Sequence, residues 1–312
     1  MEAIRPRQTP SLCLGLEGGK QNQDLPGGVR IENQDVMRLK ASIRKKCKEL
    51  GVNSQILHLN FMFEHFLDRL TKSVYSRMFI IKGGFLISAI VGLSTRSTMD
   101  IDATLKGMTL DKETMYRAFI DICSIKTGDG IEFKVLSIEE IQEGGEYPGL
   151  RIHLSGRLQT IITPFSVDLT TGDEITPSAL EFVYKPVFGD EPIKLQAYNL
   201  ETVIAEKVET ILRRGTTNTR MRDFFDVYLL FKTRGREIDL EILKRAIKHT
   251  SEKRGSLAKS NDWAQIISRV ETDAEMNLFW ARYRATILIA GEIGFHDACE
   301  AVRTIMSLVT KA

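Results

Sequence analysis

Two aspartates, Asp100 and Asp102, are separated by one residue within an apolar stretch of the chain. In a β-strand, residues two positions apart point to the same side, so these carboxylates would lie together on one face. Asp168 has a similar setting, because apolar and polar residues alternate from Phe165 to Leu169. If the two strands are neighbours, three carboxylates converge, and a divalent cation that prefers oxygen ligands, Mg²⁺ or Mn²⁺, would relieve their repulsion. The alternative is that each aspartate pairs with a neighbouring arginine or lysine.

A Lys-Gly-Gly turn precedes the two aspartates. Lys82, Gly83 and Gly84 follow a short apolar run and lead into a predicted helix. Glycines at a strand–helix junction let the backbone approach a ligand closely, and the free N–H groups at the start of a helix favour a phosphate. Arg96 and Thr98 lie just before the aspartates and could reach the same phosphates. The P-loop pattern GxxxxGK[ST] is absent here, and a turn of this kind is not specific by itself.

The order of these features resembles a known superfamily. A Gly-Gly turn, a short helix, two aspartates in an apolar strand and a later strand aspartate resemble the nucleotidyltransferases related to DNA polymerase β. The string K-G-G…R-x-T-x-D-I-D is similar to that of the AbiEii/AbiGii-type toxin nucleotidyltransferase family, which includes the MenT toxins. Two later stretches resemble the remaining motifs of that family: Glu206-Lys207, and the set Arg222, Asp223 and Asp226.

This resemblance implies a metal-dependent nucleotidyltransferase that is the toxin of a type IV toxin–antitoxin (abortive infection) system. It implies transfer of a nucleoside monophosphate from an NTP to an RNA acceptor, such as the 3′ end of tRNA, and a cognate antitoxin encoded nearby. The residues that it assigns to catalysis are Asp100, Asp102, Asp168, Lys207 and Asp226, of which the first three would hold Mg²⁺ or Mn²⁺. The residues that it assigns to nucleotide binding are Lys82, Gly83, Gly84, Arg96, Thr98, Arg222 and Asp223.

The later motifs also have plain structural interpretations. Lys207 borders the apolar face of a predicted helix, so it could extend its ammonium group past that face into solvent. Asp223 and Asp226 are three residues apart on the next predicted helix. One carboxylate would interact favourably with the dipole at the start of the helix, and the other would form an ion pair. In the functional interpretation, Asp226 positions Arg222 or the nucleotide.

A cluster of arginines surrounds the predicted loop between these two helices. Arg213, Arg214 and Arg220 would lie beside the site and form a basic track for RNA. Other classes of function stay open from the residues alone. They are a small-molecule nucleotidyltransferase of the antibiotic-resistance kind, a metal-dependent nuclease, and a catalytically silent binding module that keeps the fold.

The surrounding elements predict an α/β (α+β) fold, in which a mixed-sheet nucleotidyltransferase lobe is followed by a mostly helical C-terminal lobe. The predicted domains are a flexible tail at 1–32, an α/β lobe with N-terminal helices at 33–198 and a helical lobe at 199–312. Predicted strands cover 78–81, 99–105, 131–138, 151–158, 160–169 and 182–188. Predicted helices cover 33–50, 54–73, 85–91, 112–125, 200–214, 219–234, 238–251, 262–270, 273–291 and 295–310.

Composition sets the wider limits. The chain has 312 residues, of which 43% are hydrophobic and 27% charged, with a formal net charge of +2. These values are typical of a globular protein, and a nucleic-acid surface would have to be local. No apolar run approaches the ~20 residues that cross a bilayer, and no signal peptide is recognisable, so a cytoplasmic protein without a membrane partner is expected. The predicted helix at 33–50 is rich in lysine and arginine, which favours a solvated face over RNA binding.

Overall fold

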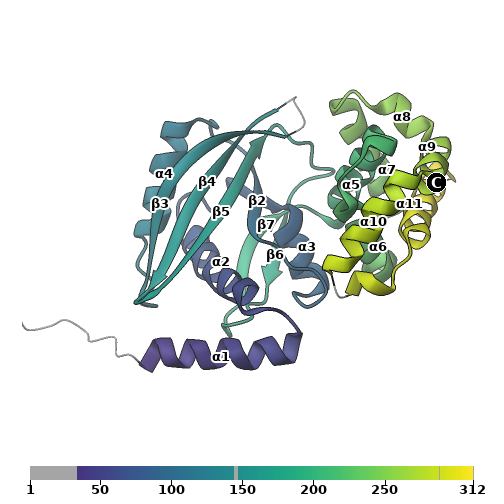
Figure 1. Ribbon diagram of the computed structural model, residues 1–312. Coiled ribbons are helices and arrows are strands. Elements are labelled where there is room, and N and C mark those ends of the chain that lie inside the picture. Colours follow the sequence, from purple (N-terminus) through teal and green to yellow (C-terminus); the bar gives the residue numbers. More distant parts are fainter. Residues whose placement is uncertain (1–33, 144–146, 288, 312) are drawn as a thin grey trace, which may run out of the picture.

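The computed structural model of the protein describes residues 34–143, 147–287 and 289–311 (Figure 1). The predicted tail at 1–32 lies outside the described residues. A twisted mixed sheet with its helices is followed by a region made almost wholly of helices, so the predicted α/β fold is confirmed. The proposed division into lobes at residue 198 stays a prediction.

The sheet has seven strands among the described residues, and two parallel pairs lie near its centre. In order across the sheet, the strands are β3 (Ile131–Glu143), β4 (Tyr147–Leu158), β5 (Ile161–Thr171), β2 (Asp100–Leu105), β1 (Phe79–Lys82), β7 (Ile193–Ala197) and β6 (Leu180–Tyr184). Strand β2 pairs in parallel with β5, and β1 pairs in parallel with β7, whereas the other neighbours are antiparallel. The central strands β1, β2 and β5 are those that carry the predicted site.

The N-terminal half also contributes α1 (Gln34–Leu50), α2 (Ser54–Lys72), α3 (Gly83–Val91) and α4 (Lys112–Ser124). Helices α2 and α4 pack on one face of the sheet through aromatic rings. Phe66 of α2 stacks on Phe119 of α4 at 5.8 Å between ring centroids and meets Phe165 of β5 edge-on at 5.7 Å. Ile101 and Val167 are buried on this face, so the residues that alternate with them point to the opposite face.

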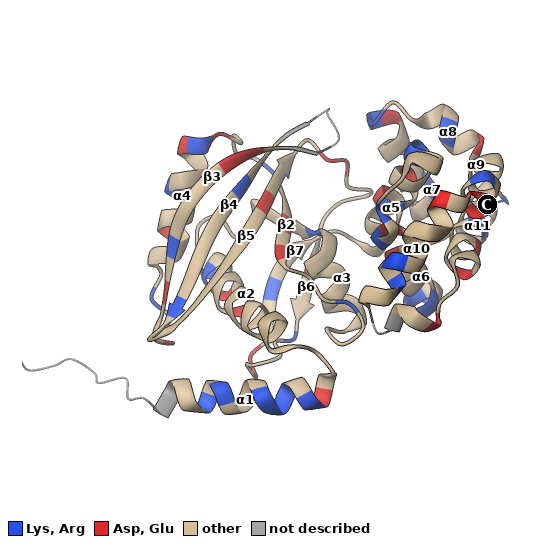
Figure 2. Ribbon diagram, in the orientation of Figure 1, with Lys and Arg blue, Asp and Glu red and all other residues tan. Residues whose placement is uncertain are grey.

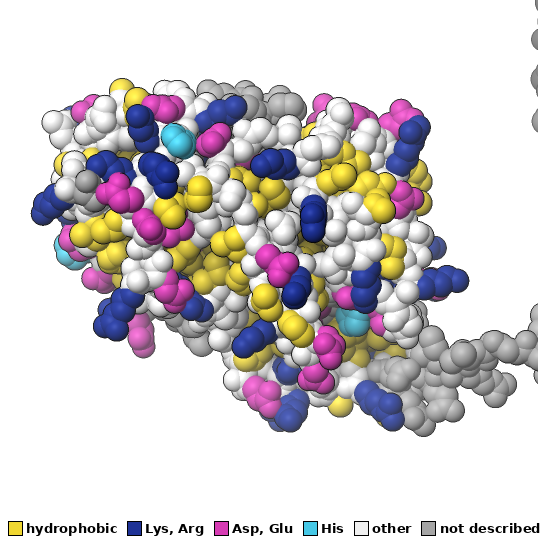
Figure 3. Space-filling model, turned by 180° about the vertical axis from the view of Figure 1, so that it is seen from behind, with side chains coloured by type: hydrophobic (Ala, Val, Ile, Leu, Met, Phe, Trp, Pro, Cys, Tyr) yellow, Lys and Arg dark blue, Asp and Glu magenta, His cyan; other side chains and the backbone are white. Residues whose placement is uncertain are grey.

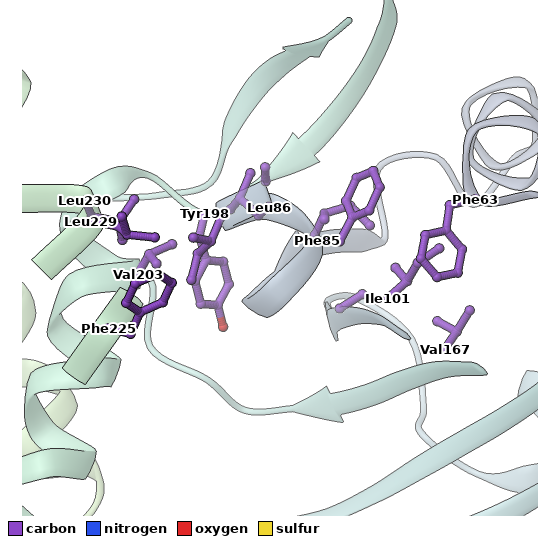
Figure 4. Close-up of a cluster of buried hydrophobic side chains, with 14 of the residues drawn as sticks. Phe63, Phe85, Leu86, Ile101, Val167, Tyr198, Val203, Phe225, Leu229 and Leu230 are labelled. Carbon is purple, nitrogen blue, oxygen red and sulfur yellow. The ribbon is translucent and has the colours of Figure 1, made fainter. Parts of the chain in front are cut away.

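The helical region comprises α5 (Leu200–Arg214), α6 (Met221–Arg234), α7 (Leu240–Lys253), α8 (Leu257–Asn261), α9 (Trp263–Thr272), α10 (Ala274–Thr286) and α11 (Phe295–Lys311). Asn199 caps α5, because its side chain accepts a hydrogen bond from the Thr202 N–H at 2.8 Å. Figure 4 shows α3 between two groups of buried side chains. Phe85 lies toward the sheet, and Val203 and Phe225 of α5 and α6 lie on the other side. One continuous core therefore joins the helical region to the sheet through α3.

Several observed elements differ from the predicted ones. The predicted strand at 182–188 ends instead at Tyr184, because the Glu64 carboxylate accepts hydrogen bonds from the N–H groups of Val187 and Phe188 and takes them out of the sheet. The five-residue strand β7 and the five-residue helix α8 were not predicted, since both are too short for a clear period. Helix α10 ends at Thr286, before the predicted end at residue 291.

Charge on the surface is mixed outside the site. The face in Figure 3 shows basic and acidic side chains interspersed. Helix α1 carries most of its lysines and arginines on an exposed side (Figure 2), while Val36, Leu39 and Ile43 are buried against the rest of the molecule. This is the arrangement of an amphipathic surface helix. Among the described residues, no helix has the length and apolar content that crossing a membrane requires.

Candidate active site

Three carboxylates lie together on the face of the sheet opposite α2 and α4. Asp100 and Asp102 are on β2, and Asp168 is on the neighbouring strand β5, directly opposite Asp102 in the strand register. Ile101 and Val167 between them are almost fully buried in the core. The parallel pairing of β2 with β5 confirms that these strands are neighbours and brings the predicted carboxylates to one patch.

The Gly-Gly turn at the start of α3 packs directly on this patch. Gly83 has φ +59°, and a Cβ added there would lie only 2.1 Å from Oδ2 of Asp102, so only glycine fits. The Gly84 N–H donates a hydrogen bond of 3.0 Å to the same oxygen. Thr98 lies beneath the turn and donates to Asp100 at 2.9 Å, but it is buried behind the site surface.

The charge on this patch is poorly compensated at Asp102. Burial and the nearby Asp100 raise its pKa from 3.8 to about 6, against the opposing effects of the Gly84 N–H and Lys82. A carboxylate with a raised pKa beside a second carboxylate is the arrangement that a divalent cation would stabilise. The oxygen donors of Asp100 and Asp102 fit Mg²⁺ or Mn²⁺.

Asp168 is engaged differently. Arg151, which lies opposite it on β4, holds both of its oxygens, at 2.7 and 2.6 Å. Asp168 is therefore paired with an arginine, as the alternative interpretation of the sequence expected. In the described part of the chain, no group of three or more His, Cys, Asp or Glu side chains is arranged so that it could hold a metal ion. The sequence signal for Arg151 was its position between apolar Leu150 and Ile152, which puts it on the site face of β4.

Lys82 reaches the site from the end of β1. Its ammonium group bonds to Asp173 at 2.8 Å, and the hydroxyl groups of Thr104 and Thr170 donate to the same carboxylate. Although burial opposes it, the Lys82 charge and these hydrogen bonds lower the pKa of Asp173 to about 2. Asp173 lies after the predicted strand at 160–169, outside every motif of the sequence, so this partner of Lys82 was missed.

A buried ion-pair network stands opposite the sheet. Lys207 of α5 bonds to Asp223 at 2.7 Å and to Asp226 at 3.0 Å, both on α6. Arg96 bonds to Asp226 at 2.7 Å. Only 14% of the Lys207 side chain is exposed, so the solvent-directed alternative is wrong. Asp226 is fully buried and orients Arg96 and Lys207, whereas the expectation that it positions Arg222 does not hold.

A cavity of about 320 Å³, here called the main cavity, joins these features. It is lined by the three carboxylates, the Lys-Gly-Gly turn, Arg96, Lys207 and Asp223, and by the arginines Arg151, Arg213, Arg214, Arg220, Arg222 and Arg254. Thr98 and Asp226 stand behind this surface. The sequence did not identify Arg254, which follows α7 and bonds to Glu206 at 3.0 Å. In all, nine basic and six acidic side chains line the main cavity, so it carries an excess of positive charge around a carboxylate patch.

The arginines of the α5–α6 connection differ in how they are held. Arg213 bonds to the buried Glu209 at 2.9 Å, and Arg220 lies 3.2 Å from Asp223. Burial and the charges of Arg220 and Arg213 lower the pKa of Arg214. Its Nε is buried and makes no hydrogen bond within the described residues. An under-compensated arginine at a cavity wall is suited to binding an anion such as a phosphate.

The family comparison agrees with this geometry. A family described as "Nucleotidyl transferase AbiEii toxin, Type IV TA system" matches residues 65–304, which is most of the chain. Among solved structures, JHP933 from Helicobacter pylori is 13% identical, with a TM-score of 0.46, and the match covers 83% of this chain and 94% of that one. A second chain, titled "putative nucleotidyltransferase from H. pylori", is 14% identical, with a TM-score of 0.45 and coverage of 83% of this chain and 96% of that one. No curated protein matched the chain.

Proposed function

The chain belongs to the AbiEii family of nucleotidyltransferase toxins from type IV toxin–antitoxin systems, and on that premise we propose that it transfers a nucleoside monophosphate from an NTP to RNA. The observation that supports this proposal most directly is the main cavity. It combines a Gly-Gly turn, a carboxylate patch and an excess of basic side chains in one space. A nuclease would not need the turn, and a silent binding module would not need the uncompensated charge at Asp102.

In the proposed reaction, a hydroxyl group of the acceptor attacks the α-phosphorus of the NTP, and pyrophosphate leaves. The backbone at Gly83 and Gly84 would approach the triphosphate closely, since no side chain blocks it there. Lys207 and Arg96 are held rigidly by Asp226, so they would offer fixed positive charge to the departing pyrophosphate. Because these ion pairs fix both side chains, the two side chains would move little when the phosphates bind.

We further propose that the reaction depends on Mg²⁺ or Mn²⁺ held by Asp100 and Asp102, with Asp168 as a third ligand. When bound, the metal would neutralise phosphate charge and lower the pKa of the attacking hydroxyl group. The chain itself supplies the carboxylates and, through the Gly84 N–H, fixes the orientation of Asp102. The pair with Arg151 occupies one lone pair on each oxygen of Asp168, so a metal would compete with Arg151 for this carboxylate.

The acceptor is proposed to be RNA, with the 3′ end of tRNA as the first candidate. Arg214 and Arg220 line the main cavity and are the basic groups best placed to meet phosphates of a strand entering it. As a type IV toxin, the protein is expected to have an antitoxin as its partner, and we propose that it acts in the cytoplasm.

Incubation of the purified protein with each labelled NTP, Mg²⁺ and total RNA tests the proposal. We expect tRNA to lengthen by one or a few nucleotides, and Asp100→Asn to abolish this product. Arg214→Gln should reduce transfer to RNA far more than NTP binding, since the Arg214 Nε makes no hydrogen bond to the described residues that the change would break. If all RNA stays unmodified while a small molecule is nucleotidylated, the resistance-type enzyme replaces this proposal. If RNA is degraded without NTP, a nuclease does.

A further inference from the structure

A second cavity, of about 380 Å³, adjoins the main one. It lies between the start of α6 and the helix α10, which are packed against each other. The two cavities share Arg220, Arg222 and Asp223, and the second one adds Phe279, Arg282 and Tyr283 from α10. None of the predicted site residues lies on α10, so these side chains have no role in the proposed reaction so far.

The aromatic wall of the second cavity is held in place by ring contacts. The Tyr283 ring packs on Phe225 and Trp280 at 5.8 and 5.7 Å between ring centroids. Its hydroxyl oxygen is buried and has no well-formed hydrogen bond within the described residues, although Arg222 lies near it. The Tyr283 ring therefore forms a fixed wall of the second cavity, with the Arg222 guanidinium group beside its hydroxyl group.

The charge of the second cavity is positive. Arg220, Arg222 and Arg282 line it together with a single carboxylate, Asp223, which is already bonded to Lys207. Arg222 and Arg282 are exposed, and Figure 2 marks basic positions on both α6 and α10. Phe279 is half-buried, so part of its ring is open to a ligand. Arginines beside aromatic rings are the combination that holds single-stranded nucleic acids, since the rings stack on bases and the guanidinium groups meet phosphates.

We infer that the second cavity binds a nucleotide of the single-stranded acceptor, with its base against Phe279 and Tyr283 and its phosphate on Arg222 and Arg282. This inference rests on the proposed function, because it names where the RNA of that reaction sits. The acceptor is favoured over the NTP as the occupant. The Gly-Gly turn and the carboxylate patch line the main cavity and are not among the residues of the second one. An RNA strand bound in the second cavity would pass Arg222 and Asp223 to reach the reacting groups in the main cavity.

The test measures binding rather than transfer. A fluorescently labelled single-stranded RNA of twelve uridines is titrated with the full-length protein without NTP, and anisotropy gives the Kd. Phe279→Leu, which keeps an apolar side chain but removes the ring, should raise the Kd by about 5- to 100-fold. Phe279→Tyr should restore binding. Arg282→Gln should raise the Kd and reduce the slope of log affinity against log salt by about 0.7.

Matched controls come from the same helix. Leu278 and Arg284 line neither cavity, so Leu278→Ala and Arg284→Gln should bind RNA as the unchanged protein does. NTP affinity should stay the same in all five variants. The inference is overturned if the unchanged protein does not bind the RNA, or if Phe279→Leu and Arg282→Gln bind RNA like the controls. It is also overturned if these two variants lose NTP affinity instead, because the cavity would then hold the base of the NTP.

The two proposals can fail separately. If the protein binds RNA through the second cavity but transfers no nucleotide to any RNA, the proposed function fails and this inference stands. If transfer to RNA occurs and is unaffected by Phe279→Leu and Arg282→Gln, the proposed function stands and this inference fails.

Discussion

Replacing Asp102 with asparagine should stabilise the protein at neutral pH in the presence of a chelator. In the folded protein, burial and the charge of Asp100 raise the pKa of Asp102 from 3.8 to about 6. Each unit of pKa difference corresponds to ~1.4 kcal/mol, so ionised Asp102 lowers the free energy of unfolding by up to about 3 kcal/mol. Asparagine keeps the oxygen that accepts from the Gly84 N–H but weakens that bond, which leaves a net gain of about 2 kcal/mol.

The sign of this effect depends on pH. Because the folded-state pKa of Asp102 is higher than the unfolded one, its destabilising effect is fully present above about pH 6 and disappears as the pH falls below about 4. The advantage of Asp102→Asn should therefore be about 2 kcal/mol at pH 7.5, or roughly 3 °C in Tm, and close to zero at pH 4. Transfer activity should be lost at both values.

Denaturant unfolding at pH 7.5 and at pH 4 measures the difference directly. Asp190→Asn is the matched control, since Asp190 is exposed on a loop and its replacement changes the net charge equally. An Asp102→Asn variant that is less stable than the unchanged protein at pH 7.5 would refute the reasoning. A stability gain of the same size at both pH values would also refute it, because the gain would then come from packing rather than from charge.

Two further variants test the surroundings of Asp102. Lys207→Met should abolish transfer and lower the free energy of unfolding by roughly 3–5 kcal/mol, because the fully buried Asp226 loses one of its partners; denaturant unfolding that shows no loss would contradict the buried network. Gly83→Ala should lower both stability and transfer, because a Cβ at Gly83 collides with Asp102. Gly51 has φ +65° and open space around it, so Gly51→Ala should lower stability alone. Unfolding and transfer assays on both variants check this.

The parts of the site that the sequence predicted are those fixed by local geometry. The alternation of side chains along a strand placed Asp100 and Asp102 on one face, whatever the tertiary structure. It placed Asp168 on one face of β5 in the same way, and the parallel register then brought it opposite Asp102. The Asn199 cap of α5 is local in the same sense, because the interaction spans only three residues. Such patterns carry their information within a few neighbouring positions.

The remaining features depend on contacts between distant segments. The pair of Lys82 with Asp173 joins residues 91 positions apart, and no local pattern distinguishes Asp173 from any other turn residue. The end of β6 at Tyr184 is decided by Glu64, which lies on α2 and takes the backbone N–H groups of the following residues. The second cavity arises because α10 packs beside α6, so Phe279 had no recognisable role until the helices were placed.

Arg151 offers the sharpest test of how the carboxylate patch is balanced. Its guanidinium group holds both oxygens of Asp168, at 2.7 and 2.6 Å, and is about one-third exposed, with 38% of the side chain accessible. In the absence of a metal, it supplies the positive charge that Asp168 needs. In the proposed reaction a metal would compete for the same oxygens. Arg151 therefore stabilises the metal-free site but weakens the binding of Asp168 to a metal.

Arg151→Met should therefore have opposite effects in two conditions. With a chelator, the variant should lose about 1–3 kcal/mol of stability, because a carboxylate is left without its charge-assisted hydrogen bonds. With Mg²⁺, its increase in Tm should be larger than that of the unchanged protein, because Asp168 is free to join Asp100 and Asp102. Arg151→Lys is the control, since it keeps the charge but cannot hold both oxygens in a fork. A Mg²⁺-induced increase in Tm that is smaller in Arg151→Met than in the unchanged protein would mean that Arg151 positions Asp168 for the metal, and that the competition argued here is wrong.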